Sequence, residues 1–168
     1  MVKYYYFDAS VLVKAYFWEE GTEDVRQVLR ELGAAPADTR VITSSLAFVE
    51  AVSALSRRTF AGELTPIEAE EVWERLVHDF GDYVVLEPKQ DLVSRAAELT
   101  RRHRLRAIDA IHLATGMAAR GHAAPWADFR FASADRRLNV AATAELFEVF
   151  NPDSPVPPGT STPVTPSE

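Results

Sequence analysis

The chain has 168 residues, of which 47% are hydrophobic and 26% are charged, a composition typical of one globular domain. It contains no cysteine, which excludes disulfides, thiolate metal sites and cysteine nucleophiles. Its formal net charge of −7 argues against a protein that binds nucleic acid through an evenly basic surface. No apolar run approaches the ~18 residues of a membrane span and the first residues do not form a signal peptide, so we expect a soluble, cytoplasmic protein.

Residues 151–168 differ in composition from the rest of the chain. They hold six of the ten prolines and neither an aromatic nor a basic residue, which predicts a disordered tail after a folded domain at residues 1–150. Without the tail, 23 acidic residues face 18 basic ones, so the acidity belongs to the domain. Of the basic residues 15 are arginine, which suits forked phosphate contacts, although genomic base composition gives the same bias.

Within the domain, short apolar runs alternate with longer segments of helical period, as in repeated βα units. The predicted strands are Lys3–Phe7, Arg40–Thr43, Tyr83–Glu87, Phe129–Ala132 and Leu146–Phe150. The predicted helices are Val11–Trp18, Thr22–Leu32, Leu46–Phe60, Pro66–Phe80, Asp91–His103, Ile108–Arg120 and Arg136–Ala144. Thr65 and Glu68 form a capping box around Pro66, and Gly33 and Gly121 are predicted to end their helices in the left-handed conformation. Strands joined by crossover helices run parallel, which predicts an α/β three-layer sandwich with a central, mainly parallel five-stranded sheet.

Acidic residues follow two of the predicted strands. Asp8 directly follows the first strand, with Ser10 placed to bond its carboxylate or to cap the next helix; taken alone, Asp8 is itself more simply a helix cap. Asp135 comes just after the fourth strand, with Ser133 as a hydroxyl partner two residues earlier, and it too is a common type of helix start.

Two further acids lie in apolar helical segments. Glu50 lies in the first half of the helix after the second strand, where it either joins a site, pairs with Arg57 or Arg58, or faces solvent. Asp109 lies in the first turn of a helix, which favours an anion, among apolar neighbours that indicate burial. His112, one turn later, is interpreted as a hydrogen-bonded core residue rather than a base.

These four acids are expected to meet at one edge of the sheet, because strand ends and the starts of the following helices lie together there. Carboxylates gathered in one place repel one another unless a hard cation neutralises them, and Mg²⁺ or Mn²⁺ is the usual partner of oxygen ligands. The pattern therefore predicts a metal-assisted hydrolysis.

Four motifs in this order, Asp8-Ala9-Ser10, Phe48-Val49-Glu50, Ile108-Asp109-Ala110-Ile111-His112-Leu113-Ala114 and Phe131-Ala132-Ser133-Ala134-Asp135, resemble those of the PIN-domain nucleases. The likeness covers about residues 3–150 and is strongest to the VapC ribonuclease toxins of bacterial toxin–antitoxin pairs. It implies a Mg²⁺- or Mn²⁺-dependent endoribonuclease that is inhibited by a VapB-like antitoxin and forms a homodimer.

Carried over motif by motif, the resemblance makes Asp8 and Asp109 the main metal ligands, with Glu50 and Asp135 completing the acidic cluster. Ser10 and Ser133 would support the ligands through their hydroxyls. The cation would offset the charge of the scissile phosphate and activate a water for in-line attack, so no protein nucleophile is needed.

Positive charge near the site is expected to contact the RNA backbone. The candidates are the arginines just before Asp109, among them Arg104 and Arg106, followed by Arg136 and Arg137 beside Asp135. A solvated helix end that complements the helix dipole explains the first group equally well. For the antitoxin, the predicted helices Val11–Trp18 and Leu46–Phe60 are expected to form the walls of a groove near the site.

Three other functions remain open from the sequence. A haloacid-dehalogenase-like phosphatase would use Asp8 as its nucleophile, but it needs a second aspartate where Ser10 stands. A solitary PIN nuclease in RNA processing would lack the antitoxin. A non-catalytic PIN-like interaction module would not need all four acids, which are present here.

Overall fold

A computed structural model describes residues 2–154, which form five strands and seven helices. The strands are β1 (Lys3–Phe7), β2 (Thr39–Ser44), β3 (Val84–Leu86), β4 (Asp128–Ala132) and β5 (Glu148–Phe150). The helices are α1 (Ala9–Tyr16), α2 (Thr22–Ala34), α3 (Ser45–Phe60), α4 (Pro66–Phe80), α5 (Gln90–His103), α6 (Ala107–His122) and α7 (Arg136–Ala144). Every predicted strand and helix is present, with ends that differ by one or two residues in most cases.

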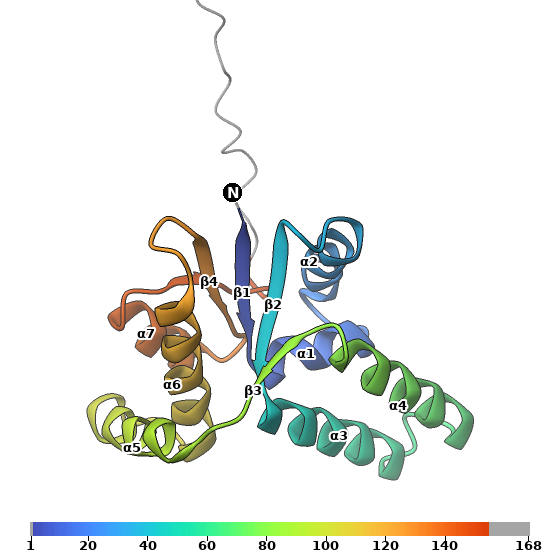
Figure 1. The fold of residues 1–168 in the computed structure, drawn as a ribbon. Coiled ribbons are helices and arrows are strands. Elements are labelled where there is room, and N and C mark those ends of the chain that lie inside the picture. The colour runs from blue at the N-terminus through green and yellow to red at the C-terminus, as the bar shows by residue number, and fades with distance from the viewer. Residues whose placement is uncertain (1, 155–168) are drawn as a thin grey trace, which may run out of the picture.

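The strands form one sheet in the order β3-β2-β1-β4-β5, and every neighbouring pair is parallel. This confirms the predicted fold class. In the register, Phe7 at the end of β1 lies beside Thr43 of β2 and Ala132 of β4. The three central strands therefore end at the same level, at the bottom of the view in Figure 1.

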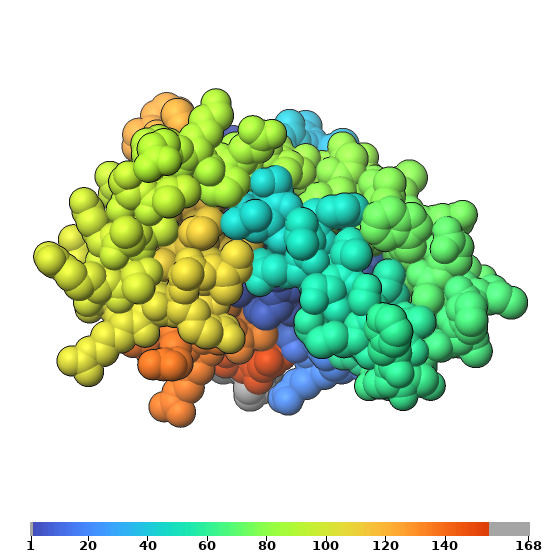
Figure 2. Space-filling view, turned by 90° about the horizontal axis from the view of Figure 1, so that it is seen from below, coloured from blue at the N-terminus to red at the C-terminus, as the bar shows by residue number. Residues whose placement is uncertain are grey.

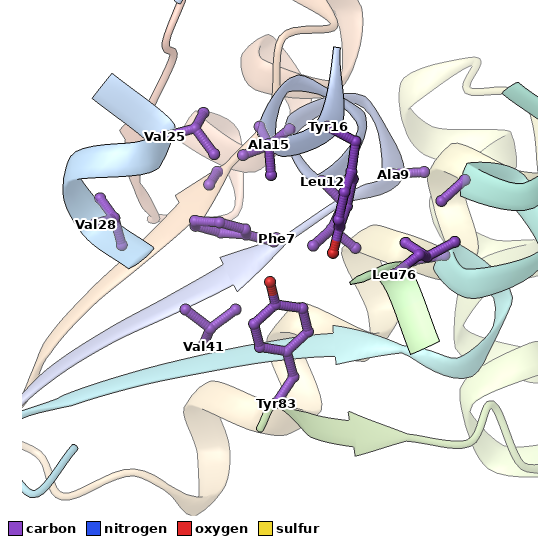
Figure 3. Packing of buried hydrophobic residues seen from close by; sticks show 14 of the residues in the cluster. Phe7, Ala9, Leu12, Ala15, Tyr16, Val25, Val28, Val41, Leu76 and Tyr83 are labelled. Carbon is purple, nitrogen blue, oxygen red and sulfur yellow. The ribbon is translucent and has the colours of Figure 1, made fainter. Parts of the chain in front are cut away.

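Helices cover both faces of the sheet, and alternation along β1 explains how they are divided. Tyr5 and Phe7 point into a core formed with α1 to α4, whereas Tyr6 points into a second core formed with α5 to α7. Figure 3 shows the first core, where Phe7 packs among side chains of α1 and α2, and where the hydroxyls of Tyr16 and Tyr83 face one another.

The chain reverses its direction of winding between β1 and β4. From β1 it moves outward through β2 to β3, then returns to the other side of β1 with β4 and continues to β5. In open α/β sheets the crevice at such a reversal, outside the carboxyl ends of the strands, is where ligands bind. Asp8 and Asp135 follow the two strands that flank this crevice.

Two of the predicted helix ends are wrong, whereas the predicted capping box is present. Thr65 accepts from the backbone of Glu68, and the Glu68 carboxylate accepts from the backbone of Thr65. Gly33 and Gly121 lie inside α2 and α6, and in the described part of the chain the glycines with positive φ are Gly21 and Gly62. A glycine permits the left-handed conformation without requiring it, so both helices continue for one residue beyond it.

The folded contacts extend past residue 150. Pro152 is buried, and the Asp153 carboxylate lies 2.7 Å from the ammonium of Lys14 in α1. The predicted disordered tail lies outside the described residues from position 155 onward. Within residues 2–154, no helix has the length and apolar character needed to cross a membrane.

Candidate active site

Asp8 follows β1 and is the N-cap of α1, as the simpler interpretation of the sequence predicts. A capping carboxylate can also take part in a site. The Asp8 carboxylate accepts from the Val11 amide at 3.0 Å and from the Ser10 hydroxyl at 2.6 Å. The preceding backbone is fixed on both sides, because the Asp8 amide donates to the carbonyl of Ala132 and the Thr43 hydroxyl donates to the carbonyl of Phe7. Asp8 is only 4% exposed.

The loop after β4 is tied to the loop after β1. The Ser10 hydroxyl oxygen accepts from the Ala134 amide at 2.9 Å, while that of Ser133 accepts from the Asp135 amide at 3.0 Å. Asp135 caps α7, since its carboxylate accepts from the amides of Arg137 and Leu138. The Ser10 hydroxyl thus ties the two acidic loops together, and the Ser133 hydroxyl bonds the backbone of Asp135 rather than its carboxylate.

One arginine joins the third and fourth acids. Arg106, at the N-cap of α6, donates to both carboxylate oxygens of Asp109, from Nε at 2.7 Å and from Nη2 at 3.0 Å. The same Nη2 lies 3.2 Å from Oδ2 of Asp135. Asp109 is buried, as predicted, but the side chain of Arg106 is 67% exposed. The guanidinium is therefore a cation shared by two of the predicted metal ligands.

Glu50 has a partner that the sequence does not reveal. Its carboxylate accepts from Nε2 of His112 at 2.7 Å, and Nδ1 of His112 lies 2.9 Å from the hydroxyl of Tyr6. A neutral imidazole satisfies both bonds when Nε2–H donates to Glu50 and Nδ1 accepts from Tyr6. The expected alternative of a salt bridge with Arg57 or Arg58 is wrong, because Arg57 donates to Ser53 and Arg58 to Glu19 and Glu63.

Burial raises the pKa of Asp8 above its ordinary value. The electrostatic interaction with His112 and the hydrogen bonds from Ser10 and Val11 act in the opposite direction without cancelling the effect. The side chain forms no ion pair within residues 2–154. A carboxylate at this depth is stabilised in its charged form by a nearby cation.

The four acids meet at one edge of the sheet, but their present spacing is not that of a metal centre. Within the described part of the chain, no group of three or more His, Asp or Glu side chains lies close enough to hold a metal ion. Asp109 and Asp135 are held by Arg106, and Glu50 by His112. The donor set still suits a hard divalent cation, because it consists of carboxylate oxygens and includes the buried, cation-free Asp8.

Figure 2 looks onto this edge and shows the N-terminal segment, in dark blue, at the bottom of a hollow between the teal α3 and the yellow α6. Of the arginines expected to contact RNA, Arg106 is bound to the acids, whereas Arg104 and Arg136 are exposed. Arg104 ends α5 in the left-handed conformation. Arg136 and Arg137, both exposed, directly follow Asp135, so basic side chains that are not bound to the acids lie next to one of the four acids.

Comparison with known proteins identifies the family. The family model for the PIN domain matches residues 5–137, which is most of the chain. The chain belongs to the PIN domain family. PIN domains are generally nucleases, so the acidic edge is the candidate active site of a hydrolase that acts on nucleic acid.

Solved structures agree with this fold. PAE2754 from Pyrobaculum aerophilum matches with a TM-score of 0.57 and 16% identity over 83% of this chain and 84% of that one. A chain of a toxin–antitoxin complex from Klebsiella pneumoniae matches with a TM-score of 0.54 and 16% identity over 89% of this chain and 97% of that one. No curated protein matches the sequence.

Proposed function

We propose that this PIN-domain protein is a Mg²⁺- or Mn²⁺-dependent endoribonuclease of the VapC type, held inactive by a VapB-like antitoxin. The observation that carries the proposal is the convergence of four acids from separate elements at the reversal point of the sheet, with Asp8 buried and without an ion-pair partner among residues 2–154. The ordered motifs that resemble VapC toxins and the fold likeness to a chain from a toxin–antitoxin complex support it.

In this proposal Asp8 and Asp109 are the main ligands of the cation, and Glu50 and Asp135 complete the set. When bound, the cation would neutralise the scissile phosphate and make a water nucleophilic at neutral pH. Ser10 holds the Asp8 carboxylate in its orientation, while His112 fixes that of Glu50. Arg106 must release Asp109 and Asp135, which its exposed position permits.

The antitoxin is proposed to cover the acidic edge and the neighbouring groove between α1 and α3. A basic side chain from the antitoxin would satisfy the acids there, as Arg106 does within this chain. A homodimer is proposed as the form that the antitoxin binds, and light scattering of the purified protein measures its mass.

RNA cleavage by the purified protein tests the function. We expect Mn²⁺ or Mg²⁺ to support cleavage, EDTA to stop it, and Asp8→Asn or Asp109→Asn to reduce it at least a hundredfold. Asp91→Asn is the matched control, because Asp91 is an exposed aspartate of α5 outside the site and should leave cleavage unchanged. Cleavage that persists in both active-site variants would overturn the proposal.

A further inference from the structure

A cleft lined by residues of α1 and α3 adjoins the acidic edge. It has a volume of about 660 Å³, and Ser10, Glu50 and Ala134 of the candidate active site are among the residues that line it. Residues of α1 and α3 continue the lining on two sides, with small side chains such as Ala54 and Ala61 leaving the space open. The cleft is therefore a continuation of the active site rather than a separate cavity.

Three cationic side chains line this cleft, and two of them are neutralised. Lys14 pairs with Glu19 and Asp153, at 3.3 and 2.7 Å. Arg58 pairs with Glu19 and Glu63, both at 3.1 Å. These ion pairs leave little positive charge available for a ligand.

Arg57 differs from its neighbours. Its side chain is exposed and donates a hydrogen bond to the neutral hydroxyl of Ser53 at 2.8 Å. Within residues 2–154 it forms no ion pair with a carboxylate. Of the three cations that line the cleft, Arg57 is therefore the one that no carboxylate of the described residues neutralises.

The position of Arg57 suits contact with a strand that also reaches the acids. Seven residues, or about two helical turns, separate it from Glu50, so both side chains lie on the same face of α3 with a rise of about 10 Å between them. An extended strand lying in the cleft would then place one phosphate at the carboxylates and a flanking phosphate at the guanidinium. A forked guanidinium is well suited to bind phosphate.

We propose that single-stranded RNA runs through the α1–α3 cleft and that Arg57 binds a backbone phosphate next to the scissile one. This inference rests on the proposed ribonuclease function and adds the path of the substrate. It also accounts for how an acidic domain retains RNA, because one uncompensated arginine beside the active site supplies attraction that the overall charge does not.

Fluorescence anisotropy with a labelled single-stranded RNA tests the proposal. Binding is measured in the Asp109→Asn background, which prevents turnover, with and without Arg57→Gln, at several salt concentrations. Loss of one phosphate contact should weaken binding about fivefold and make the slope of log affinity against log salt shallower by about 0.7. In the wild-type background, Arg57→Gln should raise KM by a similar factor and change kcat little.

Arg95→Gln is the control, since it removes the same charge from an exposed position on α5. Arg95 lies beside Met117 and Gly121, at the opposite end of α6 from Asp109. If the Arg57 and Arg95 variants bind RNA with equal affinity and equal dependence on salt, the inference is overturned, and the cleft would then serve only to bind the antitoxin. If the wild-type protein neither binds nor cleaves RNA, the proposed function fails instead.

Discussion

Replacing Arg106 with glutamine is expected to strengthen the binding of Mn²⁺ or Mg²⁺ to the acidic edge. The guanidinium donates two hydrogen bonds to Asp109 and one to Asp135, so it stands where a cation would use the same carboxylates. A metal ion that uses both ligands must first displace it. Glutamine keeps much of the side-chain volume but removes the competing charge.

The structure sets the size of this effect. The side chain of Arg106 is 67% exposed, and exposed ion pairs contribute up to about 1 kcal/mol each. Contacts with two carboxylates therefore oppose metal binding by up to about 2 kcal/mol. Since about 1.4 kcal/mol corresponds to a factor of ten, the dissociation constant should fall by up to about 30-fold.

Calorimetric titration of the metal-free protein with Mn²⁺ measures the change directly. Arg136→Gln is the matched control, because Arg136 is exposed next to Asp135 and, within residues 2–154, forms no bond to a carboxylate. Its loss should alter the affinity much less. Mn²⁺ binding by the Arg106 variant that is no tighter than binding by the Arg136 variant would show that Arg106 does not compete with the metal.

Three further predictions concern stability. Gly116→Ala should lower the free energy of unfolding in urea by about 1 kcal/mol, because the new Cβ would lie 2.8 Å from a ring carbon of buried Phe131. The cost of this overpacking outweighs the gain in helix propensity. A variant as stable as the wild type, or more stable, would contradict this prediction. A hydrogen bond from His103 lowers the pKa of Glu145 below its ordinary value of 4.5. The ionised Glu145 therefore stabilises the fold above pH 4.5, and this stabilisation is lost as the pH falls through the lowered pKa. Glu145→Gln should thus cost about 1 kcal/mol at pH 7 and make the acid side of the stability profile shallower, and an unchanged profile would count against the bond. Burial raises the pKa of Asp8 above 3.8, so the charged carboxylate destabilises the metal-free fold at pH 7. Asp8→Asn should therefore raise the thermal stability at pH 7, and this gain in stability should disappear as the pH falls below 3.8. A loss of thermal stability at pH 7 would contradict the prediction.

Local signals in the sequence predict most of the fold and the acidic residues of the site. Asp8 and Asp135 can be predicted because each is a polar residue that follows a buried strand. Both are also helix caps, since the strand end and the helix start lie close together there. An acid in an apolar first turn marked Asp109, which is buried. These signals depend on residues a few positions apart, which is why they can be read from one sequence.

The partners of these acids depend on contacts between distant residues, and no local pattern predicts them. Glu50 and His112 are 62 positions apart, and Tyr6 and His112 are 106 positions apart. The bond from Arg106 to Asp135 likewise joins α6 to the loop after β4. Asp109 and His112 are three residues apart, so both lie on one face of α6. This spacing is the one local signal in the sequence that connects His112 with the site.

The central claim is a cation-dependent attack of water on an RNA phosphodiester, and isotope labelling of the products tests it most directly. Single-stranded RNA is incubated with the protein and Mn²⁺ in water enriched in ¹⁸O, and the new ends are analysed by mass spectrometry. The account predicts one ¹⁸O atom in each new terminal phosphate and no cleavage with EDTA or with Asp8→Asn. Unlabelled cyclic phosphate ends, or cleavage that the Asp8 variant retains, would contradict it.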